Sequence, residues 1–326
     1  MQMKIFITGS AGFLGSNLAN QLLEKGYYVI AYDNLSMGKI ENIDYLLSNP
    51  RFSFIKGDVK DLPTLQSASL GADLIVHLAA YKIPRYGNAL ETLLTNSIGT
   101  KNVLDIAITN KTKVVFGSTS DVYGKNSSIP FREDSDCLLG PSTVRRWSYA
   151  VSKLFDEHLC YAYQESYDLP VTILRFFGSY GPQQHLTWWG GPQSVFIDAI
   201  LKGKPVEIHG DGLQTRTFTY VSDTVNGIVA AMECDQSKGE IFNIGSSGEI
   251  SILGLANLIK RLSGTAGELD YKLVPYSTFG NYEDVRRRIP DTSKARRILD
   301  FDAKVSLEEG LSQTIQWQRE VTEIRN

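Results

Sequence analysis

The chain has 326 residues, of which 42% are hydrophobic and 21% are charged, and its formal net charge is -3. This is the composition of a soluble globular protein with room for one large domain or two smaller ones. It excludes a nucleic-acid binder, which would carry a basic stripe, and a membrane protein, because no run of about 18 apolar residues is present.

Cysteine usage and the amino terminus indicate the compartment. Cys137, Cys160 and Cys234 lie far apart without metal-ligand spacing, which favours free thiols in a reducing cytosol and no bound metal. The amino terminus enters a strand pattern at once and lacks the apolar segment of a signal peptide. We therefore predict a cytoplasmic protein.

The first 33 residues have the pattern of a βαβ unit with glycines at its first turn. A strand is predicted over residues 4–8, a helix up to about residue 25 and a second strand over 27–32. The turn carries Gly9, Gly12 and Gly15, which let the backbone approach a pyrophosphate held by the helix N-terminus. Asp33 follows at the spacing of an acid that binds the adenosine ribose, and it would repel a 2′-phosphate. NAD is therefore predicted rather than NADP.

Strands and helices continue to alternate. Further strands are predicted over residues 52–56, 73–77, 113–118 and 171–175, with helices over 92–110 and 149–167. Repeated βα units predict an α/β fold, a doubly wound parallel sheet of the Rossmann type, whose ligands bind at the carboxyl ends of the strands. Five residues should lie at that edge: Asp33, Asp58, Ala80, Ser118 and Arg175.

The second half of the chain is more mixed. A loop rich in Gly, Pro and Trp covers residues 178–192, helices are predicted near 194–202, 222–233, 252–263 and 307–320, and strands near 206–208 and 218–221. We predict an NAD-binding Rossmann domain over residues 1–175 and a smaller mixed α/β substrate-binding lobe over residues 176–326, with interleaved boundaries.

Tyr149 and Lys153 are neighbours on one face of the predicted helix 149–167, because residues four apart are adjacent on a helix. An ammonium beside a phenol stabilises the phenolate and lowers its pKa. The pair could remove a proton from a hydroxyl while a hydride leaves the same carbon. Such spacing is common by chance, so the pair needs support from elsewhere in the chain.

That support comes from a combination of motifs. Residues 8–15, Asp33, Ser118-Thr119-Ser120 and Tyr149-x-x-x-Lys153 together resemble the extended short-chain dehydrogenase/reductases that modify nucleotide sugars. The resemblance implies bound NAD, a nucleotide-sugar substrate such as a UDP-sugar, and a homodimer packed through the helices near 92–110 and 149–167. The implied NAD-binding residues are Gly9, Gly12, Phe13, Leu14, Gly15, Asp33, Asn34, Ser36, Asp58, Val59, Leu78, Ala79, Ala80, Asn96, Tyr149 and Lys153.

The resemblance also implies a reaction at C4 of the sugar. Tyr149 removes the 4-OH proton, Thr119 hydrogen-bonds the same oxygen, and Lys153 holds the nicotinamide ribose. The resulting 4-keto sugar can accept hydride on its other face, lose water, or lose carbon dioxide if C5 carries a carboxylate. Members of the family differ in which of these three reactions the 4-keto intermediate undergoes.

Residues 119–121 bear on that choice. The chain has Thr119-Ser120-Asp121 where 4,6-dehydratases resemble Thr-Asp-Glu, decarboxylases Thr-Ser-Glu and glucuronate 4-epimerases Thr-Ser-Ser. UDP-glucuronate decarboxylation is therefore the leading prediction, and 4-epimerisation of a UDP-hexose or UDP-hexuronate is the alternative. An NAD-sensing regulator without turnover is a third reading, which the intact Thr119, Tyr149 and Lys153 disfavour. Asp121 is predicted either as an acid/base group or as a helix cap.

Several residues are candidates for the substrate site. Arg216 would clamp the diphosphate, and Arg288 resembles an arginine that lies near the carboxylate in decarboxylases and near the diphosphate in epimerases. Lys82 and Arg85 could face a sugar carboxylate. Gly178 stands where the family usually has an Asn that touches the substrate. Trp188 and Trp189 are predicted either to cap the pocket or to pack elsewhere, and His77 and His185 are predicted to be structural.

Overall fold

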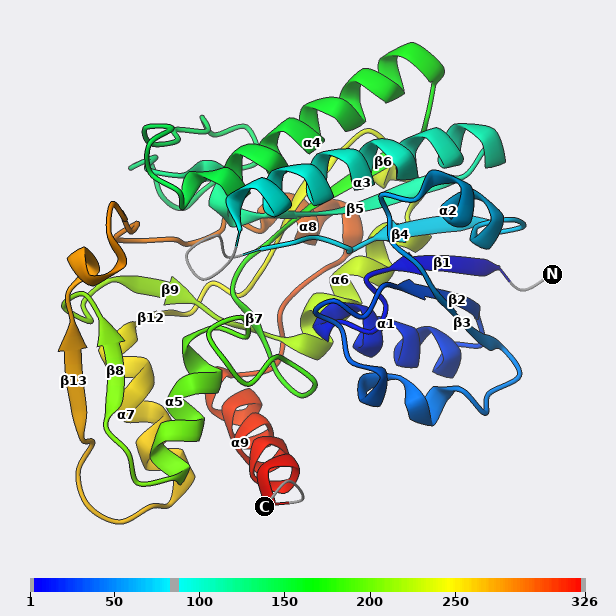
Figure 1. Ribbon diagram of the computed structural model, residues 1–326. Coiled ribbons are helices and arrows are strands. Elements are labelled where there is room, and N and C mark those ends of the chain that lie inside the picture. The colour runs from blue at the N-terminus through cyan, green and yellow to red at the C-terminus, as the bar shows by residue number, and fades with distance from the viewer. Residues whose placement is uncertain (1–2, 83–87, 324–326) are drawn as a thin grey trace.

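A seven-stranded parallel sheet forms the centre of the molecule in the computed structural model, which describes residues 3–82 and 88–323 (Figure 1). Its strand order is β11-β6-β5-β4-β1-β2-β3, and every neighbouring pair is parallel. The strands are β1 (Lys4–Thr8), β2 (Tyr28–Asp33), β3 (Phe52–Lys56), β4 (Leu74–His77), β5 (Lys113–Thr119), β6 (Val171–Phe176) and β11 (Ile241–Ile244).

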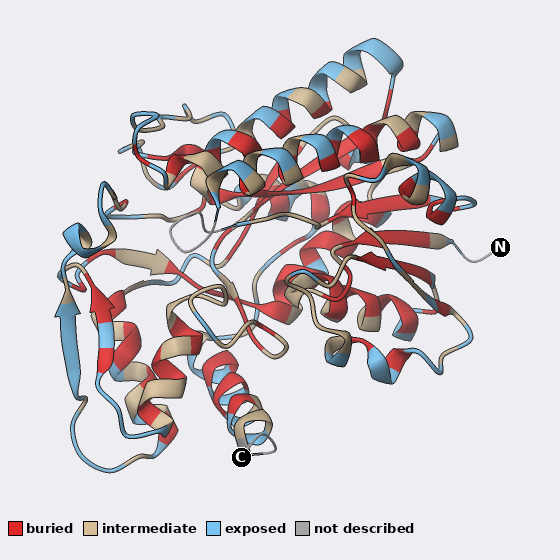
Figure 2. Cartoon of the chain, in the orientation of Figure 1, coloured by how far each residue is buried: buried red, intermediate tan, exposed pale blue. Residues whose placement is uncertain are grey.

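Helices cover both faces of this sheet, as a doubly wound fold requires. Helices α3 (Ala89–Asn110) and α4 (Trp147–Tyr167) pack side by side on one face, with the short α2 (Leu62–Ala68) beside α3. Helices α1 (Phe13–Glu24) and α6 (Val221–Glu233) pack together on the other face. Apolar residues from both layers bury the central strands, which are red over most of their length in Figure 2.

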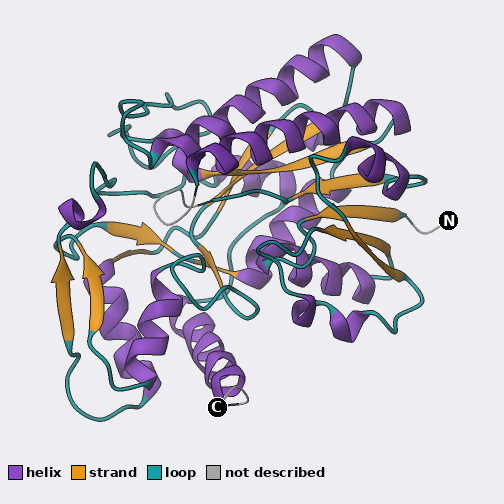
Figure 3. Ribbon diagram, viewed as in Figure 1, coloured by secondary structure: helices purple, strands orange, loops and turns teal. Residues whose placement is uncertain are grey.

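A smaller group of elements lies beside the sheet and forms the second lobe (Figure 3). Its helices are α5 (Pro192–Leu201), α7 (Ile252–Ser263) and α9 (Leu307–Glu323), which contact one another. Its short strand pairs are β7 (Ser179–Tyr180) with β10 (Thr219–Tyr220), β8 (Val206–His209) with β13 (Tyr271–Val274), and β9 (Thr215–Thr217) with β12 (Glu249–Ser251). Helix α8 (Ser293–Leu299) returns to pack on β11 and α6 of the main body.

The predicted α/β class and the doubly wound sheet are confirmed. Strand β11 joins the large sheet although it follows residue 176, so both halves of the chain contribute to one sheet. The sequence reading missed β11, α2 and α8, and it placed Val221 in a strand, whereas Val221 begins helix α6. Among residues 3–82 and 88–323, none of the helices combines the length and the apolar composition that a membrane-spanning segment requires.

Candidate active site

A cavity of about 860 Å³ lies between the carboxyl edge of the large sheet and the second lobe. The sheet contributes the ends of β1, β2, β4 and β5, and the lobe contributes residues from α5, β8 and β9. This is the position at which doubly wound proteins bind their ligands.

The glycine turn between β1 and α1 forms one end of the cavity. A Cβ added at Gly9 would lie 2.7 Å from Ala79 N, and one added at Gly15 would lie 2.1 Å from Gly9 O, so larger residues do not fit. The helix begins after Gly12, which supplies no side-chain cap. Free N–H groups and the helix dipole therefore face the cavity, and they fit the pyrophosphate of a dinucleotide.

Asp33 lies beside this turn and is 7% exposed. Its Oδ2 accepts a hydrogen bond from Ala11 N at 2.9 Å, and its Oδ1 accepts one from Leu35 N at 2.8 Å. Burial raises the pKa of the Asp33 carboxyl, and the two backbone N–H groups oppose that shift. Asn34 Nδ2 donates to Asp58 Oδ2 at 3.0 Å, which places a second carboxylate at the same rim. The arrangement fits ribose hydroxyls and disfavours a further phosphate.

Most predicted cofactor residues do line the cavity. These are Gly9, Gly12, Phe13, Leu14, Gly15, Asp33, Asn34, Ser36, Asp58, Val59, Leu78, Ala79, Ala80 and Tyr149. Asn96 and Lys153 do not line it. Asn96 is buried, and its amide bonds the backbone of Tyr81 and, at 2.9 Å, the hydroxyl of Ser152. Asn96 thus supports the wall rather than facing the space.

Thr119 and Tyr149 meet at the centre of the cavity. Thr119 ends β5 and Tyr149 lies in the first turn of α4, and both line the space. The pKa of Tyr149 is raised above its ordinary value, first by burial and then by the charge of Asp121, while a hydrogen bond with Thr119 and the charge of Arg288 oppose the rise. Ser120 is 2% exposed and is not among the residues that line the cavity.

Lys153 is placed differently from the expectation. The sequence predicts that its ammonium lowers the pKa of Tyr149, but Lys153 is not among the groups that dominate that pKa. Its Nζ lies 4.0 Å from the centroid of the Phe116 ring, and the residue is 2% exposed. The Lys153 ammonium therefore faces the Phe116 ring, and Lys153 is not among the residues that line the cavity.

A buried ion pair holds the catalytic helix to the sheet. Arg175 in β6 bonds Glu157 of α4 twice, at 3.0 and 2.7 Å, and Ser118 donates to the same carboxylate at 2.5 Å. Arg175 is only 4% exposed. Arg175 therefore has a structural role at the carboxyl edge of the sheet. Its ion pair with Glu157 holds the helix that carries Tyr149 in position against the sheet.

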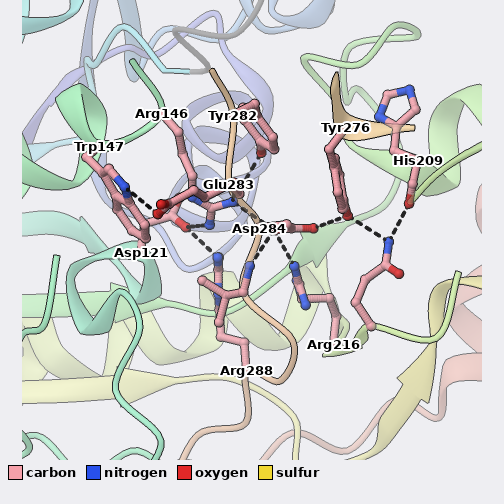
Figure 4. A network of polar contacts seen from close by, with 12 residues as sticks. Asp121, Arg146, Trp147, His209, Arg216, Tyr276, Tyr282, Glu283, Asp284 and Arg288 are labelled. Carbon is pink, nitrogen blue, oxygen red and sulfur yellow. Dashed lines mark hydrogen bonds and ion pairs between the residues drawn. The ribbon is translucent and has the colours of Figure 1, made fainter. Parts of the chain in front are cut away.

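Three arginines and two carboxylates form a cluster on the substrate side (Figure 4). Asp121 Oδ1 pairs with Arg288 Nη2 at 2.6 Å and with Arg146 Nη2 at 3.3 Å. Asp284 Oδ1 pairs with Arg146 Nη1 at 2.7 Å and with Arg216 Nη2 at 2.8 Å. All five residues line the cavity. We call them the arginine–aspartate cluster.

The two carboxylates of this cluster stay ionised. Burial disfavours their charge, but Arg288 and Arg146 hold the pKa of Asp121 below its ordinary value. Arg216 and Arg146 do the same for Asp284, which also accepts a hydrogen bond from Tyr276 at 2.6 Å. The sequence by itself assigns no role to Arg146, Tyr276 or Asp284. Their motifs alone do not show that they meet.

The structure explains Gly178. Its φ is +46°, and a Cβ added there would lie 2.1 Å from Thr217 O. The backbone of the neighbouring strand β9 therefore occupies the space that an asparagine side chain would need. Gly178 still lines the cavity, but only through its backbone.

The remaining candidates fall on the cavity rim. Lys82 is exposed and lines the cavity, whereas Arg85 lies outside the described residues.

Trp189 packs edge-to-face on Tyr81 at 5.1 Å, which brings the loop after β7 across to the end of β4. Trp188 stacks on His209 at 4.1 Å in the second lobe. Both tryptophans border the cavity and make packing contacts.

Neither of the two histidines considered from the sequence has a metal-site geometry. His77 is buried, its Nδ1 lies 2.7 Å from Thr8 Oγ1, and burial followed by Lys153 lowers its pKa to about 3. His185 bonds Thr187 at 2.9 Å. Across residues 3–82 and 88–323, no group of three or more His, Cys, Asp or Glu side chains is arranged to hold a metal ion.

Comparison with known proteins gives the family to which this fold and site belong. The model of the GDP-mannose 4,6 dehydratase family matches residues 6–314. The chain therefore belongs to this family of NAD-dependent epimerases and dehydratases.

Two curated relatives extend the match over nearly the whole chain. A UDP-N-acetyl-α-D-glucosaminuronate decarboxylase from Bacillus cytotoxicus is 39% identical and covers 98% of this chain and 99% of its own. The UDP-glucuronic acid decarboxylase 1 of Xenopus tropicalis is 36% identical. Its match covers 98% of this chain and 73% of the length of the relative.

Solved structures agree with the fold. The UDP-glucuronic acid 4-epimerase of Bacillus cereus, in complex with UDP-glucuronic acid and NAD, has a TM-score of 0.87 and 33% identity, covering 98% of this chain and 100% of that one. An epimerase from Methanothermobacter thermautotrophicus has a TM-score of 0.90 and 31% identity. The match covers 99% of this chain and 94% of that epimerase. The chain is an enzyme of this nucleotide-sugar decarboxylase and 4-epimerase kind, and NAD is its cofactor.

Proposed function

We propose that the enzyme decarboxylates a UDP-hexuronate, with UDP-glucuronate as the leading substrate, through a 4-keto intermediate. One observation carries this proposal: the arginine–aspartate cluster lies within electrostatic range of the Tyr149 phenol, because Asp121 and Arg288 both shift its pKa. The carboxylate carbon attached to C5 is two bonds from the C4 at which Tyr149 would act. A cation for that carboxylate must lie near Tyr149, and the effect of the Arg288 charge on the phenol supports Arg288 in this role.

The charge balance of the cluster supports an anionic substrate. Three guanidinium groups face two carboxylates, which leaves one net positive charge at the cavity wall. A UDP-hexuronate brings a diphosphate and a carboxylate to this wall. We assign the diphosphate to Arg216 and the sugar carboxylate to Arg288, with residues 1–175 as the NAD-binding part and 176–326 as the sugar-binding lobe.

The chemistry starts at Tyr149. Its phenolate removes the 4-OH proton while Thr119 hydrogen-bonds the oxygen, and bound NAD supplies the hydride acceptor. In the 4-keto acid the C5–C6 bond then breaks, carbon dioxide leaves, and the electron pair is delocalised from C5 onto the C4 oxygen. Thr119 and Tyr149 hydrogen-bond that oxygen and stabilise its charge. A proton from solvent at C5 gives the 4-keto pentose. Return of the hydride to C4, with the proton held by Tyr149 passing to the C4 oxygen, would give the UDP-pentose and restore the bound cofactor.

Asp121 acts in this scheme as a charged positioning group. Because arginines hold its pKa below the ordinary value, it carries no proton to donate at neutral pH. We expect Asp121→Asn to lower kcat/KM for UDP-glucuronate by about 10- to 100-fold, because Arg288 and Arg146 lose the carboxylate that orients them.

A pH profile checks this role of Asp121. Both limbs should remain, and the limb that reports Tyr149 should move to lower pH, because the Asp121 charge raises the pKa of that phenol. Loss of a limb would instead identify Asp121 as a proton shuttle, and unchanged kcat/KM would remove it from the mechanism.

The alternative is 4-epimerisation of a UDP-hexose or UDP-hexuronate, which the similarity to the Bacillus cereus 4-epimerase favours. The deciding experiment incubates the purified enzyme with UDP-glucuronate and UDP-glucose and identifies products by mass and NMR. A product that has lost the mass of carbon dioxide supports decarboxylation, and an isobaric product supports epimerisation. NAD binding without reaction of any nucleotide sugar would indicate a regulator and overturn both.

We also propose that the enzyme is a cytoplasmic homodimer. Exposed apolar side chains recur four residues apart along the outer faces of two neighbouring helices, at Leu90, Leu94 and Ile98 of α3 and at Val151 and Phe155 of α4. Such a stripe is the kind of surface that a second copy covers about a twofold axis. The three free cysteines suit a reducing compartment.

The Phe155→Glu variant tests the dimer. Phe155 is 52% exposed, and a carboxylate at this position would be buried without a partner in the proposed interface. We expect the variant to elute as a monomer while the wild type elutes as a dimer, with mass measured by light scattering. Leu213→Glu, at a leucine that is 59% exposed outside both helices, is the control and should stay dimeric. A monomeric wild type would contradict the proposal.

A further inference from the structure

Asp156 is a buried carboxyl that the mechanism above does not use. It lies on α4 three residues after Lys153 and seven after Tyr149, so the three side chains share one face of the helix. Asp156 is 0% exposed and Lys153 is 2% exposed. Asp156 and Lys153 are therefore neighbours on the buried face of the helix that carries Tyr149.

The surroundings of Asp156 offer its charge little support. Within the described part of the chain neither carboxyl oxygen makes a hydrogen bond of normal geometry, although Thr100 is close enough to lower its pKa. Burial raises the pKa of Asp156 to about 6, Lys153 and Thr100 oppose that rise, and Glu157 adds to it. A buried carboxylate without such bonds is tolerated only beside an opposite charge. Lys153 supplies that charge.

Lys153 in turn depends on Asp156. Burial lowers the pKa of Lys153, and the three groups that oppose this are Asp156, Cys160 and Glu157. Glu157 is already paired with Arg175 through two bonds, at 3.0 and 2.7 Å. Cys160 is buried, and its pKa lies well above the ordinary value, so it stays a neutral thiol. Of these three groups, Asp156 is therefore the one whose negative charge is not neutralised by another partner and can stabilise the Lys153 ammonium.

On the other side of Lys153, the residues that the structure describes add no competing negative charge. His77, at the end of β4, has Thr8 Oγ1 2.7 Å from Nδ1 and Thr100 Oγ1 3.2 Å from Nε2, and its low pKa keeps it neutral. The ring of Phe116 in β5 faces Lys153 Nζ at 4.0 Å. Its π face favours a cation but does not replace a counter-ion.

We propose that Asp156 is a positioning residue of this enzyme: its carboxylate is the counter-charge that keeps the buried Lys153 ionised on the helix that carries Tyr149. The proposal rests on the proposed C4 oxidation only in that Lys153 must be charged for turnover. It assigns a role to a residue two helical turns from the reacting atoms. Asp156 acts through Lys153, because its own charge opposes the Tyr149 phenolate.

The Asp156→Asn variant gives this role a distinctive signature. Without the counter-charge Lys153 loses its proton at lower pH, so the alkaline limb of the kcat/KM profile should move toward neutrality by about one pH unit or more. Turnover at pH 8 should fall by roughly 10-fold or more for the same reason. Asp156→Glu should restore part of the shift. Glu165→Gln, an exposed acid on the same helix, is the matched control and should leave both limbs in place.

Other results would overturn the proposal. If the Asp156→Asn profile kept both limbs at their wild-type pH and kcat were lower at every pH, Asp156 would have only a structural role. A lower acid limb with raised activity below pH 6 would mean that it acts directly on Tyr149. If Asp156→Asn does not fold, Asp156→Ser, a smaller neutral replacement, should move the alkaline limb in the same direction, and no shift there would contradict the proposal.

A readout independent of turnover separates this proposal from the reaction itself. The pKa of Lys153 is followed by NMR with labelled lysine, and Lys153→Met assigns the signal. We expect a lower value in Asp156→Asn than in wild type, whatever product the enzyme makes. An unchanged Lys153 pKa would reject the counter-charge even if decarboxylation were demonstrated.

Discussion

Replacing Tyr149 with Phe is expected to lower kcat for the nucleotide sugar by about 10²- to 10⁴-fold, the range usually lost with a general base. The variant removes one hydroxyl from the centre of the cavity and leaves the ring in place. Thr119 loses its bonding partner, but it cannot replace the phenol because an alcohol is a far weaker acid than a phenol. The 4-OH proton then has no acceptor.

The Tyr149→Phe experiment also separates chemistry from binding. NAD should still raise the melting temperature of the variant as it does that of the wild type, because the glycine turn and Asp33 are untouched. A loss smaller than tenfold would mean that another group takes the proton. The acid limb of the wild-type kcat/KM profile should be missing from any residual activity of the variant, because Tyr149 is the group that it reports.

Replacing Arg288 with Gln is expected to have the second-largest effect, a loss of about 100-fold or more in kcat/KM for UDP-glucuronate. The Arg288 side chain is 16% exposed and pairs with Asp121 at 2.6 Å. Without it, the sugar carboxylate loses its cation and Asp121 keeps only the longer contact with Arg146. Both effects weaken the site at which carbon dioxide would leave.

A neighbouring arginine supplies the control. Arg286→Gln removes the same charge from an arginine that is 66% exposed and pairs with Asp211 at 2.8 Å on the surface. It should cost little, because exposed ion pairs contribute about 0–1 kcal/mol. If both variants behaved alike, the effect would be one of net charge and the assignment of Arg288 would be wrong. If Arg288→Gln weakened UDP-glucose and UDP-glucuronate equally, Arg288 would serve the diphosphate instead.

Lys153 shows the limit of reasoning from spacing. The interval of four residues correctly predicts that Tyr149 and Lys153 share a helix face. It does not say where a four-carbon side chain ends, and here Nζ turns toward the Phe116 ring. The position of that charge depends on β5 and on Asp156, which are supplied by packing.

The sequence alone determines the parts of this protein whose chemistry is local. The glycine turn, Asp33 at the end of β2 and the Thr119 that ends β5 each follow from a short pattern, because backbone geometry and helix or strand periodicity act over a few residues. The alternation of strands and helices likewise predicted the doubly wound sheet. It did not predict that β11 would add to that sheet, since its four residues carry little pattern.

The tertiary structure decides how charges from distant segments neutralise one another. Asp121, Arg146, Arg216, Asp284 and Arg288 form the arginine–aspartate cluster. They come from four separate parts of the chain, and their pairing determines that Asp121 is a carboxylate rather than a proton donor. Gly178 is explained only by the carbonyl of Thr217 beside it. Electrostatic interactions and steric exclusion depend on distance in space, and the fold sets that distance.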